Sequence, residues 1–415
     1  METTLSDIAD GCKYGFVDGP FGSNLPSSCY KHKGIPVIRG CNLSIGKFRY
    51  IDQGYCFVDN IVLDKLSRST ARKFDIIFTK KGTIGQIGII PKNALYNLYL
   101  LSSNQMRLRV DISKADPYFV YYYLTQKNII KKIIRDSEST GVPKTNLAYF
   151  RSFPIKLPAL SEQQAIAHIL GTLDDKIELN RRQNATLEAM AQAIFKDWFV
   201  DFGPVHAKME GRQPEGMSRE IADLFPDRLD DEGKPEGWEW KTLDSILELC
   251  YGKALKASER IPGKTPVYGS GGITGYHNQA LVITPSIIVG RKGTIGSLYI
   301  EHRPFYPIDT VFYVKSDYSI FFCYFILKQQ KLKDMNTDAA VPGLNRNNVY
   351  RLVFSMPSNI VIEKFDAYIQ NIYKKIYHNY SEISILISLR DTLLPKLISG
   401  ELRVPDAEKM VADIV

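Results

Sequence analysis

The chain has 415 residues, too many for one ordinary domain, so its length favours two or three domains. It carries 53 Lys and Arg against 45 Asp and Glu, a formal net charge of +8. No uncharged apolar run approaches the length of a membrane helix, and the N-terminus shows no basic start followed by an apolar stretch. We therefore expect no membrane span, no export signal and residence in the cytoplasm.

The basic charge is concentrated in two blocks. Residues 1–159 have a net charge of +11 and residues 237–357 a net charge of +5, whereas residues 160–236 have −7 and residues 358–415 have −1. This distribution is expected of two polyanion-binding domains on a spacer. Ordinary solvated lysines are the alternative, and they explain the first block less well than the second.

The six cysteines predict neither a zinc site nor a disulfide framework. They include no C-x-x-C pair, and the histidines do not cluster with them. We expect buried thiols at Cys12, Cys29, Cys41, Cys56, Cys250 and Cys323.

The first domain, which we place at residues 1–158, is predicted to consist mainly of strands and turns. Its apolar segments are short and are broken by Gly, Asn and Pro; they are residues 35–38, 51–58, 75–78, 87–90 and 106–110. Helices are predicted at residues 117–124 and 128–134. A turn at Gly141–Pro143 and a last strand at residues 153–157 follow.

A long amphipathic helix is predicted from Ser161 to about Val200, within a helical segment that we place at residues 159–202. Ser161 and Gln164 form a capping box, which marks the start of the helix. Apolar residues then recur at alternating spacings of three and four, the period that keeps a seam on one helix face. Residues 203–236, rich in Pro, Gly and acidic residues, are predicted to be a connector.

The second block, residues 237–357, repeats the order of the first. Arg291–Gly296 matches Lys80–Gly85 at an offset of 211, each time after an apolar strand. Val341, Pro342 and Asn345 match Val142, Pro143 and Asn146 at an offset of 199. The chain is therefore predicted to be a tandem repeat of a basic domain followed by a long helix.

A second long helix is predicted within residues 358–402, before a C-terminal tail at residues 403–415. At the same offset of 199, Leu173, Ile177 and Asn180 fall on Ile372, Ile376 and Asn379. An Asn in an apolar seam costs stability but fixes the register, because only one alignment lets two such amides meet. We expect the two helices to pair antiparallel; two unrelated core helices are the alternative.

The run Lys-Gly-Thr-Ile-Gly after a strand predicts a tight turn that presents a basic side chain and a hydroxyl. Its glycines allow a bulky ligand to approach the backbone closely. One copy is most often just a hairpin turn. Two copies in corresponding places indicate a shared functional loop.

The helical motifs resemble those of a known family. Leu160–Asn180, Thr186–Met190 and Phe195–Phe202 closely resemble the central conserved region of specificity subunits of type I restriction-modification systems, and Leu389–Leu402 resembles the distal one. Pro20–Leu25, Tyr268–Ile273 and both Lys-Gly-Thr-Ile-Gly loops look like that family's target-recognition domains. The second helix departs from the pattern, because Ser358–Val361 lacks the Glu-Gln-Gln of the first.

This resemblance implies an α+β fold: two mixed α/β target-recognition domains joined by two long helices that form an antiparallel coiled coil. It implies a non-catalytic, prokaryotic subunit that reads double-stranded DNA. One domain reads each half of an asymmetric target, and the helices dock two methyltransferase (M) subunits, to which restriction/translocase (R) subunits are added. No cofactor is implied in this chain, since S-adenosylmethionine, ATP and Mg belong to the partner subunits.

On this basis we predict no catalytic or metal-binding residue and two sets of functional residues. The candidate DNA-binding residues are Ser23, Asn24, Arg39, Lys80, Lys81, Thr83, Lys144, Asn146, Lys253, Lys256, Tyr268, Ser270, Arg291, Lys292, Thr294, Asn345 and Arg346. The residues predicted to set the helix seam and register are Leu173, Ile177, Asn180, Ile372, Ile376 and Asn379.

Two other functions are weighed against this one. Asp227 with Glu239 and Lys241 contains the residue types of a metal-dependent nuclease, but Asp227 lies in the predicted connector, and so loose a motif recurs by chance. A purely structural coiled-coil adaptor explains the helices but not the paired basic loops.

Overall fold

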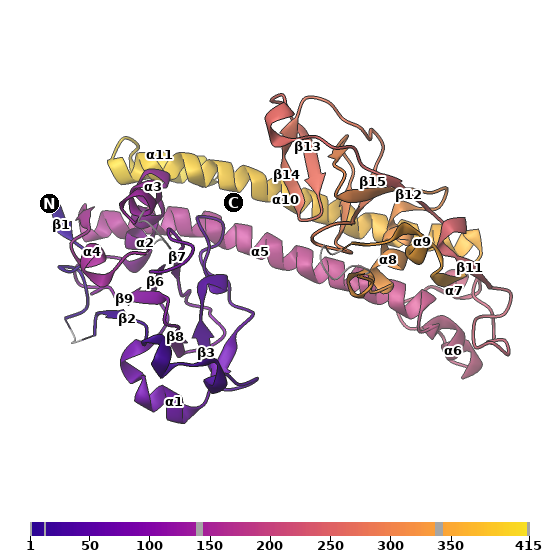
Figure 1. Ribbon diagram of the computed structural model, residues 1–415, viewed down its shortest axis with the longest axis horizontal. Helices are drawn as coiled ribbons and strands as arrows, with labels where there is room; N and C mark the ends of the chain where they lie inside the picture. The colour runs from indigo at the N-terminus through magenta and orange to yellow at the C-terminus, as the bar shows by residue number, and fades with distance from the viewer. Residues whose placement is uncertain (1, 12–13, 138–143, 337–342, 413–415) are drawn as a thin grey trace. The chain divides into compact units, whose positions relative to one another are not determined.

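The computed structural model describes residues 2–11, 14–137, 144–336 and 343–412, which form two compact units (Figure 1). Unit 1 contains residues 1–181 and 380–415, and unit 2 contains residues 182–379. Cys12, the predicted turn at Gly141–Pro143 and the matched pair Val341 and Pro342 lie outside the described residues. The boundary between the units falls inside both long helices, so each basic domain is grouped with half of each helix.

The described strands of unit 1 form three sheets. The first is antiparallel with strand order β2-β9-β6-β7, the second is mixed with order β4-β3-β8-β5, and β1 pairs antiparallel with β10. The strands are β1 (Glu2–Thr4), β2 (Phe16–Asp18), β3 (Ile35–Ile38), β4 (Cys56–Val58), β5 (Thr70–Ala71), β6 (Ile76–Thr79), β7 (Ile87–Ile89), β8 (Tyr99–Leu101), β9 (Gln105–Leu108) and β10 (Pro154–Lys156).

The helices of unit 1 include two that the sequence predicted. The predicted helix at residues 117–124 is α2, which starts after Asp116 because the carboxylate of Asp116 accepts a hydrogen bond from the Phe119 amide at 2.9 Å. The predicted helix at residues 128–134 lies within α3. The helices are α1 (Asn60–Lys65), α2 (Pro117–Thr125), α3 (Lys127–Asp136), α4 (Leu147–Arg151) and α11 (Val404–Ala412), with short 3-10 turns η1 (Gly22–Asn24), η2 (Ser27–Cys29), η3 (Gly40–Asn42) and η4 (Ser67–Ser69).

The sheets of unit 2 have the same plan. Their orders are β12-β18-β15-β16, β14-β13-β17 and β11-β19, and the β13–β17 pair is parallel, as is β3–β8 in unit 1. The strands are β11 (Glu239–Thr242), β12 (Glu248–Tyr251), β13 (Thr265–Gly269), β14 (Gly272–His277), β15 (Ser286–Gly290), β16 (Leu298–Glu301), β17 (Tyr306–Pro307), β18 (Val311–Lys315) and β19 (Val353–Met356). The predicted tandem repeat is therefore confirmed at the level of strand order.

The helices of unit 2 include two in the segment that the sequence predicted to be a connector. They are α6 (Gly203–Met209), α7 (Arg219–Ala222), α8 (Ile320–Gln329) and α9 (Arg346–Tyr350), with η5 (Leu243–Ser245), η6 (Ala257–Glu259) and η7 (Leu332–Asp334). Val205, Ala222 and Phe225 are buried in the core of the unit, so the connector is folded onto the domain instead of being free.

The two long helices are α5 (Leu160–Phe199) and α10 (Asn359–Ser399). Because α5 begins at Leu160, Ser161 lies inside its first turn, and the predicted capping box with Gln164 is wrong. Gln163 fastens this end instead: its amide nitrogen donates to the carbonyl oxygen of Pro158 at 3.0 Å, and its amide oxygen accepts from the Asp116 amide at 3.0 Å.

The helices pair antiparallel in each unit, as the sequence predicted. In unit 1, Leu173 and Ile177 of α5 are buried in one core with Ile383 and Leu386 of α10. In unit 2, Ile376 is buried and Ile372 is half-buried against a core that contains Ala191 and Phe195. An early residue of α5 therefore meets a late residue of α10.

The asparagines of the seam pair differently from the prediction. The Asn379 side-chain amide donates to the side-chain oxygen of Asn184 at 2.8 Å, whereas the Asn180 side-chain amide donates to the Glu382 carboxylate at 2.9 Å. Asn180 and Asn379 correspond in the internal repeat, but antiparallel packing places a different pair opposite one another. All three asparagines are at most 3% exposed, so the seam has a buried polar layer.

Aromatic residues fill the core of unit 2 where α5 ends. The ring of Phe199 lies 5.1 Å from that of Phe365 on α10 and 5.2 Å from that of Phe322 on α8. Trp198 lies 5.4 Å from Phe225. The aromatic C-terminal end of α5 therefore packs against both α10 and the second basic domain.

Candidate nucleic-acid interface

The two Lys-Gly-Thr-Ile-Gly loops have the same conformation. Gly82 and Gly85 have φ angles of 100° and 91°, and Gly293 and Gly296 have φ angles of 78° and 64°, which L side chains rarely adopt. In each loop the Ile amide donates to the carbonyl oxygen of the first glycine, at 2.9 Å in unit 1 and 3.1 Å in unit 2. The repeated motif therefore forms one repeated turn.

The second glycine of each turn is also required by close packing. A Cβ atom on Gly85 would lie 3.1 Å from the Ile134 side chain of α3. A Cβ atom on Gly296 would lie 2.6 Å from the backbone of Leu332. Each turn is thus fixed against the helical layer of its own domain, and the basic residue that precedes each first glycine is exposed.

Each turn is hydrogen-bonded to the segment that precedes α4 or α9. The Thr145 amide donates to the Lys80 carbonyl at 2.9 Å, and the Leu344 amide donates to the Arg291 carbonyl at 2.8 Å. These bonds bring together candidate residues that are far apart in the sequence. The resulting basic clusters contain Lys80, Lys81 and Lys144 in unit 1, and Arg291, Lys292 and Arg346 in unit 2.

A polar cavity of about 520 Å³ lies beside the turn of unit 1. Arg39, Lys81 and Thr83 are among its lining residues, together with Gln86 and Asn104. Arg39 is half-buried and donates from Nη2 to the Gly54 carbonyl at 3.3 Å. The cavity presents hydrogen-bond donors and acceptors next to exposed positive charge, which suits a polar, anionic ligand.

Lys80 is engaged in an ion pair within its own domain. Its Nζ atom forms an ion pair with Asp18 at 3.2 Å, two residues before the Pro20–Leu25 segment. Ser23 and Asn24 follow in η1 and are exposed. This ion pair holds the start of that segment next to the Lys-Gly-Thr-Ile-Gly turn.

In unit 2, the glycine-rich hairpin turn between β13 and β14 packs on the Lys-Gly-Thr-Ile-Gly turn. The Thr294 amide donates to Ser270 Oγ at 3.4 Å, and a Cβ atom on Gly293 would lie 3.3 Å from the same oxygen. Ser270 therefore positions the neighbouring turn, and Thr294 remains exposed beside it.

Tyr268 belongs to the core, contrary to its prediction as a DNA contact. Its side chain is 6% exposed, and its hydroxyl donates to the Glu301 carboxylate at 2.9 Å. Burial together with the Glu301 charge raises the pKa of Tyr268 above its ordinary value. Its hydroxyl thus stays protonated and holds two strands together.

Asn146 and Asn345 cap helices. The side-chain oxygen of Asn146 accepts from the Tyr149 amide at 2.9 Å, and that of Asn345 accepts from the Asn347 amide at 2.9 Å. An Asn before a helix satisfies an amide that the helix leaves unpaired. The repeated Asn thus positions α4 and α9 beside the basic turns.

Two remaining candidates, Lys253 and Lys256, are exposed after β12. Lys256 forms an ion pair with Glu259 at 3.7 Å.

Sequence reasoning missed Tyr251, the last residue of β12, although its ring is half-exposed among the basic residues of unit 2. The guanidinium carbons of Arg291 and Arg346 lie 5.0 and 5.1 Å from its ring centre.

A buried ionic cluster, missed by sequence reasoning, fixes the first basic domain to both helices. Asp174 on α5 accepts from Arg390 of α10 at 2.8 Å and from the Tyr122 hydroxyl of α2 at 2.8 Å. Arg49, from the loop before β4, lies 3.8 Å from the same carboxylate and also pairs with Asp175. Burial alone would lower the pKa of Arg390, but the Asp174 and Asp391 carboxylates together more than offset this and raise the pKa above its ordinary value.

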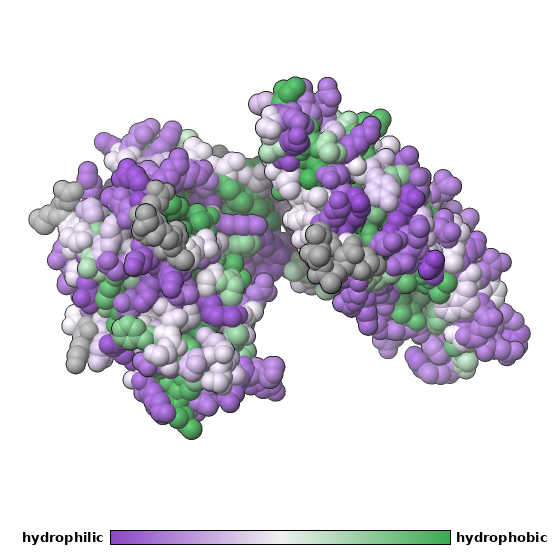
Figure 2. All heavy atoms as spheres, viewed as in Figure 1, coloured by the Kyte–Doolittle hydropathy of each residue, from purple (hydrophilic) through white to green (hydrophobic). Residues whose placement is uncertain are grey.

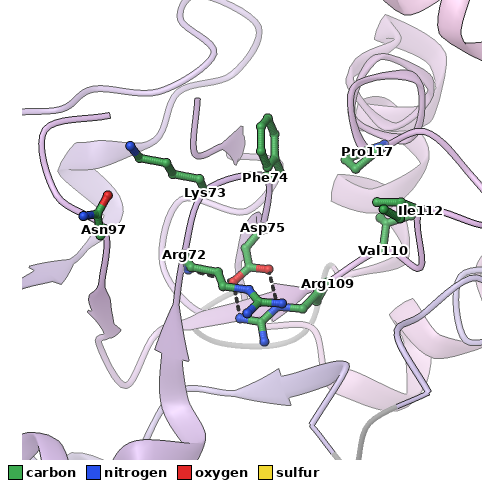
Figure 3. A pocket seen from close by; sticks show the side chains of 9 residues that line it. All are labelled: Arg72, Lys73, Phe74, Asp75, Asn97, Arg109, Val110, Ile112 and Pro117. Atoms are coloured by element: carbon green, nitrogen blue, oxygen red, sulfur yellow. Dashed lines mark hydrogen bonds and ion pairs between the residues drawn. The ribbon is translucent and has the colours of Figure 1, made fainter. Parts of the chain in front are cut away.

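A second hollow of unit 1 contains none of the predicted DNA-binding residues. It has a volume of about 380 Å³ and is lined by residues such as Lys73, Phe74 and Ile112 (Figure 3). The buried Asp75 carboxylate is engaged by Arg109 through two bonds of 2.8 Å and by the Arg72 amide at 2.8 Å. The Asp75 carboxylate therefore has a structural role.

The residues of the nuclease alternative are engaged in local ion pairs. Asp227 pairs with Lys208 at 2.6 Å, and Glu239 pairs with Lys241 at 3.8 Å. Within the described ranges, no group of three His, Cys, Asp or Glu side chains is arranged to hold a metal ion. The five described cysteines are free thiols, but the prediction of buried thiols is wrong for four of them: Cys323 is buried, whereas Cys41 is exposed and Cys29, Cys56 and Cys250 are half-buried.

Hydrophilic side chains cover much of the visible face of both units, with hydrophobic areas between them (Figure 2). Among the helices that the structure describes, none is both long and apolar enough to cross a membrane.

Comparison with known proteins identifies the family. Residues 61–189 and 235–379, more than half of the chain, match the family described as Type I restriction modification DNA specificity domain. The type I restriction enzyme HindI specificity subunit of Haemophilus influenzae is 27% identical over 84% of this chain and 91% of its own length. The MjaIX specificity subunit of Methanocaldococcus jannaschii is 27% identical over 93% of this chain and 91% of its own length.

A solved structure has the same fold. The S subunit of a type I restriction-modification system from M. genitalium aligns with a TM-score of 0.55 and 18% identity, over 96% of this chain and 95% of its own. The two segments that match the family description, residues 61–189 and 235–379, each contain one of the basic turns described above. The chain therefore belongs to the family of type I restriction-modification DNA specificity subunits.

Proposed function

We propose that this chain is the DNA-reading subunit of a type I restriction-modification complex, with one domain for each half of a bipartite, asymmetric target. The observation that carries this proposal is the duplicated basic turn, which has the same glycine conformation and the same neighbouring segment in each unit. Basic side chains at the turns supply phosphate contacts, and side chains from the adjoining loops read base edges.

The two long helices are proposed to dock two methyltransferase subunits, to which restriction/translocase subunits are added. Specificity subunits are in general non-catalytic components, and we extend this to the present chain. S-adenosylmethionine, ATP and Mg would then be bound by the partner subunits in the cytoplasm of a prokaryote. The resemblance of Leu160–Phe202 to the family's central region supports the docking role.

Methylome sequencing of a host that carries this subunit with its partners tests the proposal. The expected result is one methylated bipartite sequence with an unspecified gap, which is absent from the host without this subunit. A coiled-coil adaptor predicts instead an assembly that forms without DNA and has no salt-sensitive DNA binding. That outcome would reject the proposal.

Replacing the exposed turn lysines with alanine should weaken DNA binding in a salt-dependent way. Each lysine that contacts a phosphate releases about one counterion, so Lys81→Ala and Lys292→Ala should each reduce the slope of log affinity against log salt by about 0.9. Fluorescence anisotropy of the assembled complex at several salt concentrations measures this slope. Lys409→Ala on α11 and Lys315→Ala at the end of β18 are exposed controls, and equal slopes for all four variants would show that the turns do not contact phosphates.

Exchanging the first basic domain should change one half of the target only. Residues 1–158 replaced by the equivalent part of a relative should alter the half read by unit 1, because unit 2 is built from residues 182–379. The donor segment must supply the equivalents of Arg49 and Tyr122, since both contact Asp174 on α5. Methylation mapping gives the readout, and a change in both halves would show that the domains do not read independently.

A further inference from the structure

The basic cluster of unit 2 contains two arginines that share one aromatic ring. Arg291 follows β15, and Arg346 is the first residue of α9; their guanidinium carbons lie 5.0 and 5.1 Å from the centre of the Tyr251 ring. Arg346 also lies 5.6 Å from the ring of Tyr350. Tyr350 is itself fixed, because its hydroxyl accepts from the Leu249 amide at 2.8 Å. Aromatic rings thus restrict where both guanidinium groups can lie.

The fold uses these two arginines differently. Arg291 donates from Nη1 to the Asp309 carbonyl at 2.8 Å, so part of its donor set is occupied. The Arg346 side chain has no hydrogen bond or ion pair with any described residue, and its Nε atom is buried without a partner. A buried donor without an acceptor is costly. Arg346 therefore retains its hydrogen-bonding capacity for a ligand.

The restraint on Arg346 favours a base edge over a phosphate as that ligand. Phosphates are contacted adequately by flexible, exposed cations, and Lys253 and Lys292 supply these nearby. A planar guanidinium fixed by two rings presents its donors in a set direction, which matches the N7 and O6 acceptors of guanine in the major groove.

We propose that Arg346 reads a guanine in the half-target bound by unit 2, and that Tyr251 is the residue that positions it. This inference rests on the proposed DNA-reading function and adds a named base contact to it. Tyr251 acts through Arg346 and needs no contact with DNA of its own.

The equivalent place in unit 1 is built differently. Asp18 pairs with Met106 of β9 as Tyr251 pairs with Phe312 of β18, so Asp18 occupies the position of Tyr251. It forms the ion pair with Lys80, and Leu147 stands where α9 has Arg346. The effect of Arg346 should consequently be confined to one half of the target.

The test is methylation mapping of the complete complex carrying one variant at a time. Wild type should methylate a target with a G·C pair in the half that the domain exchange assigns to unit 2. Arg346→Ala and Arg346→Lys should each reduce the preference for that pair roughly ten- to hundredfold. Preferences at the other half and the gap length should stay unchanged, which shows that the variants are folded.

Tyr251 is tested with a matched pair of substitutions. Tyr251→Phe keeps the ring and should keep the wild-type preference, whereas Tyr251→Leu removes the ring and should relax the preference at the same G·C pair. Lys315→Ala, at an exposed lysine of unit 2 that ends β18 and is not among the candidate DNA-binding residues, is the control and should leave base preference unchanged.

Several outcomes would overturn the inference. One is a wild-type half-target without a G·C pair. Another is uniform weakening at all sites by Arg346→Ala with a reduced salt slope, which would make Arg346 a phosphate contact. Equal behaviour of Tyr251→Leu and Tyr251→Phe would remove the positioning role. Failure of the wild-type complex to methylate any bipartite target would instead contradict the proposed function itself.

Discussion

Replacing Asp174 with alanine is expected to lower the free energy of unfolding of unit 1 by about 3–5 kcal/mol. The carboxylate is 5% exposed, and it is hydrogen-bonded to Arg390 and to the Tyr122 hydroxyl. Without it, Arg390 and Arg49 would keep their charges in a site that excludes most water. Removing one partner of a buried charge cluster costs far more than the pair contributes when intact.

The placement of the tryptophans allows the effect to be assigned to one unit. Trp198, Trp238 and Trp240 are the three tryptophans of the chain, and all lie in unit 2. In urea denaturation, tryptophan fluorescence therefore reports unit 2, while amide hydrogen exchange of peptides around Leu173 reports unit 1. Asp174→Ala should accelerate exchange in unit 1 and leave the fluorescence midpoint unchanged.

The neighbouring residue provides the control for this experiment. The Asp175 side chain is 73% exposed, although it also pairs with Arg49. Asp175→Asn should cost less than about 1 kcal/mol, as expected of an exposed ion pair. A similar loss from both substitutions would show that Asp174 is no more important than a surface charge.

Lengthening both long helices by three heptads is expected to widen the unspecified gap of the target by about nine base pairs. The insertion points are after Arg181 in α5 and after Asn379 in α10, where the two units divide. All contacts of Asn180 with Glu382 and of Asn184 with Asn379 are then retained. Twenty-one residues at roughly 1.5 Å each add about 32 Å, nearly one turn of DNA.

Methylation mapping measures the gap directly. Both half-sequences should be unchanged, because no residue of the basic turns is altered. Insertion into α5 alone is the control, and it should give no active complex since the helices lose their matched lengths. An active double-insertion complex with the original gap would place control of spacing in the partner subunits.

The long helices were the most predictable part of the fold. The sequence placed the first at Ser161 to about Val200, and the structure has Leu160–Phe199. A heptad seam of this length leaves few alternatives, because each residue adds to the same periodic signal. The repeated domains were equally visible, since the repeat of Lys80–Gly85 at Arg291–Gly296 corresponds to a shared sheet order.

Contacts between remote residues were not predictable in the same way. Asn180 aligns with Asn379 in the repeat, but the partner of Asn379 is Asn184, because the internal alignment compares copies and does not show which residues face one another. Tyr268 lies in a loop-like sequence yet is buried by strands on either side. Arg390 interrupted the apolar seam, a signal that a buried partner was needed, but the sequence did not identify Asp174.

The ionic cluster around Asp174 and the packing of Ala407 and Val411 of α11 into the core of unit 1 have a consequence for synthesis on the ribosome. Unit 2 is continuous in sequence, whereas unit 1 joins residues 1–181 to residues 380–415. Leu170 and Leu173 on the apolar side of α5 share one buried core with Leu386, Leu393 and Val411 from the last part of the chain. Unit 2 can thus fold during translation. Unit 1, although its synthesis begins first, is completed last. A nascent chain released before Tyr380 would leave that side uncovered and would be a substrate for chaperones or proteases.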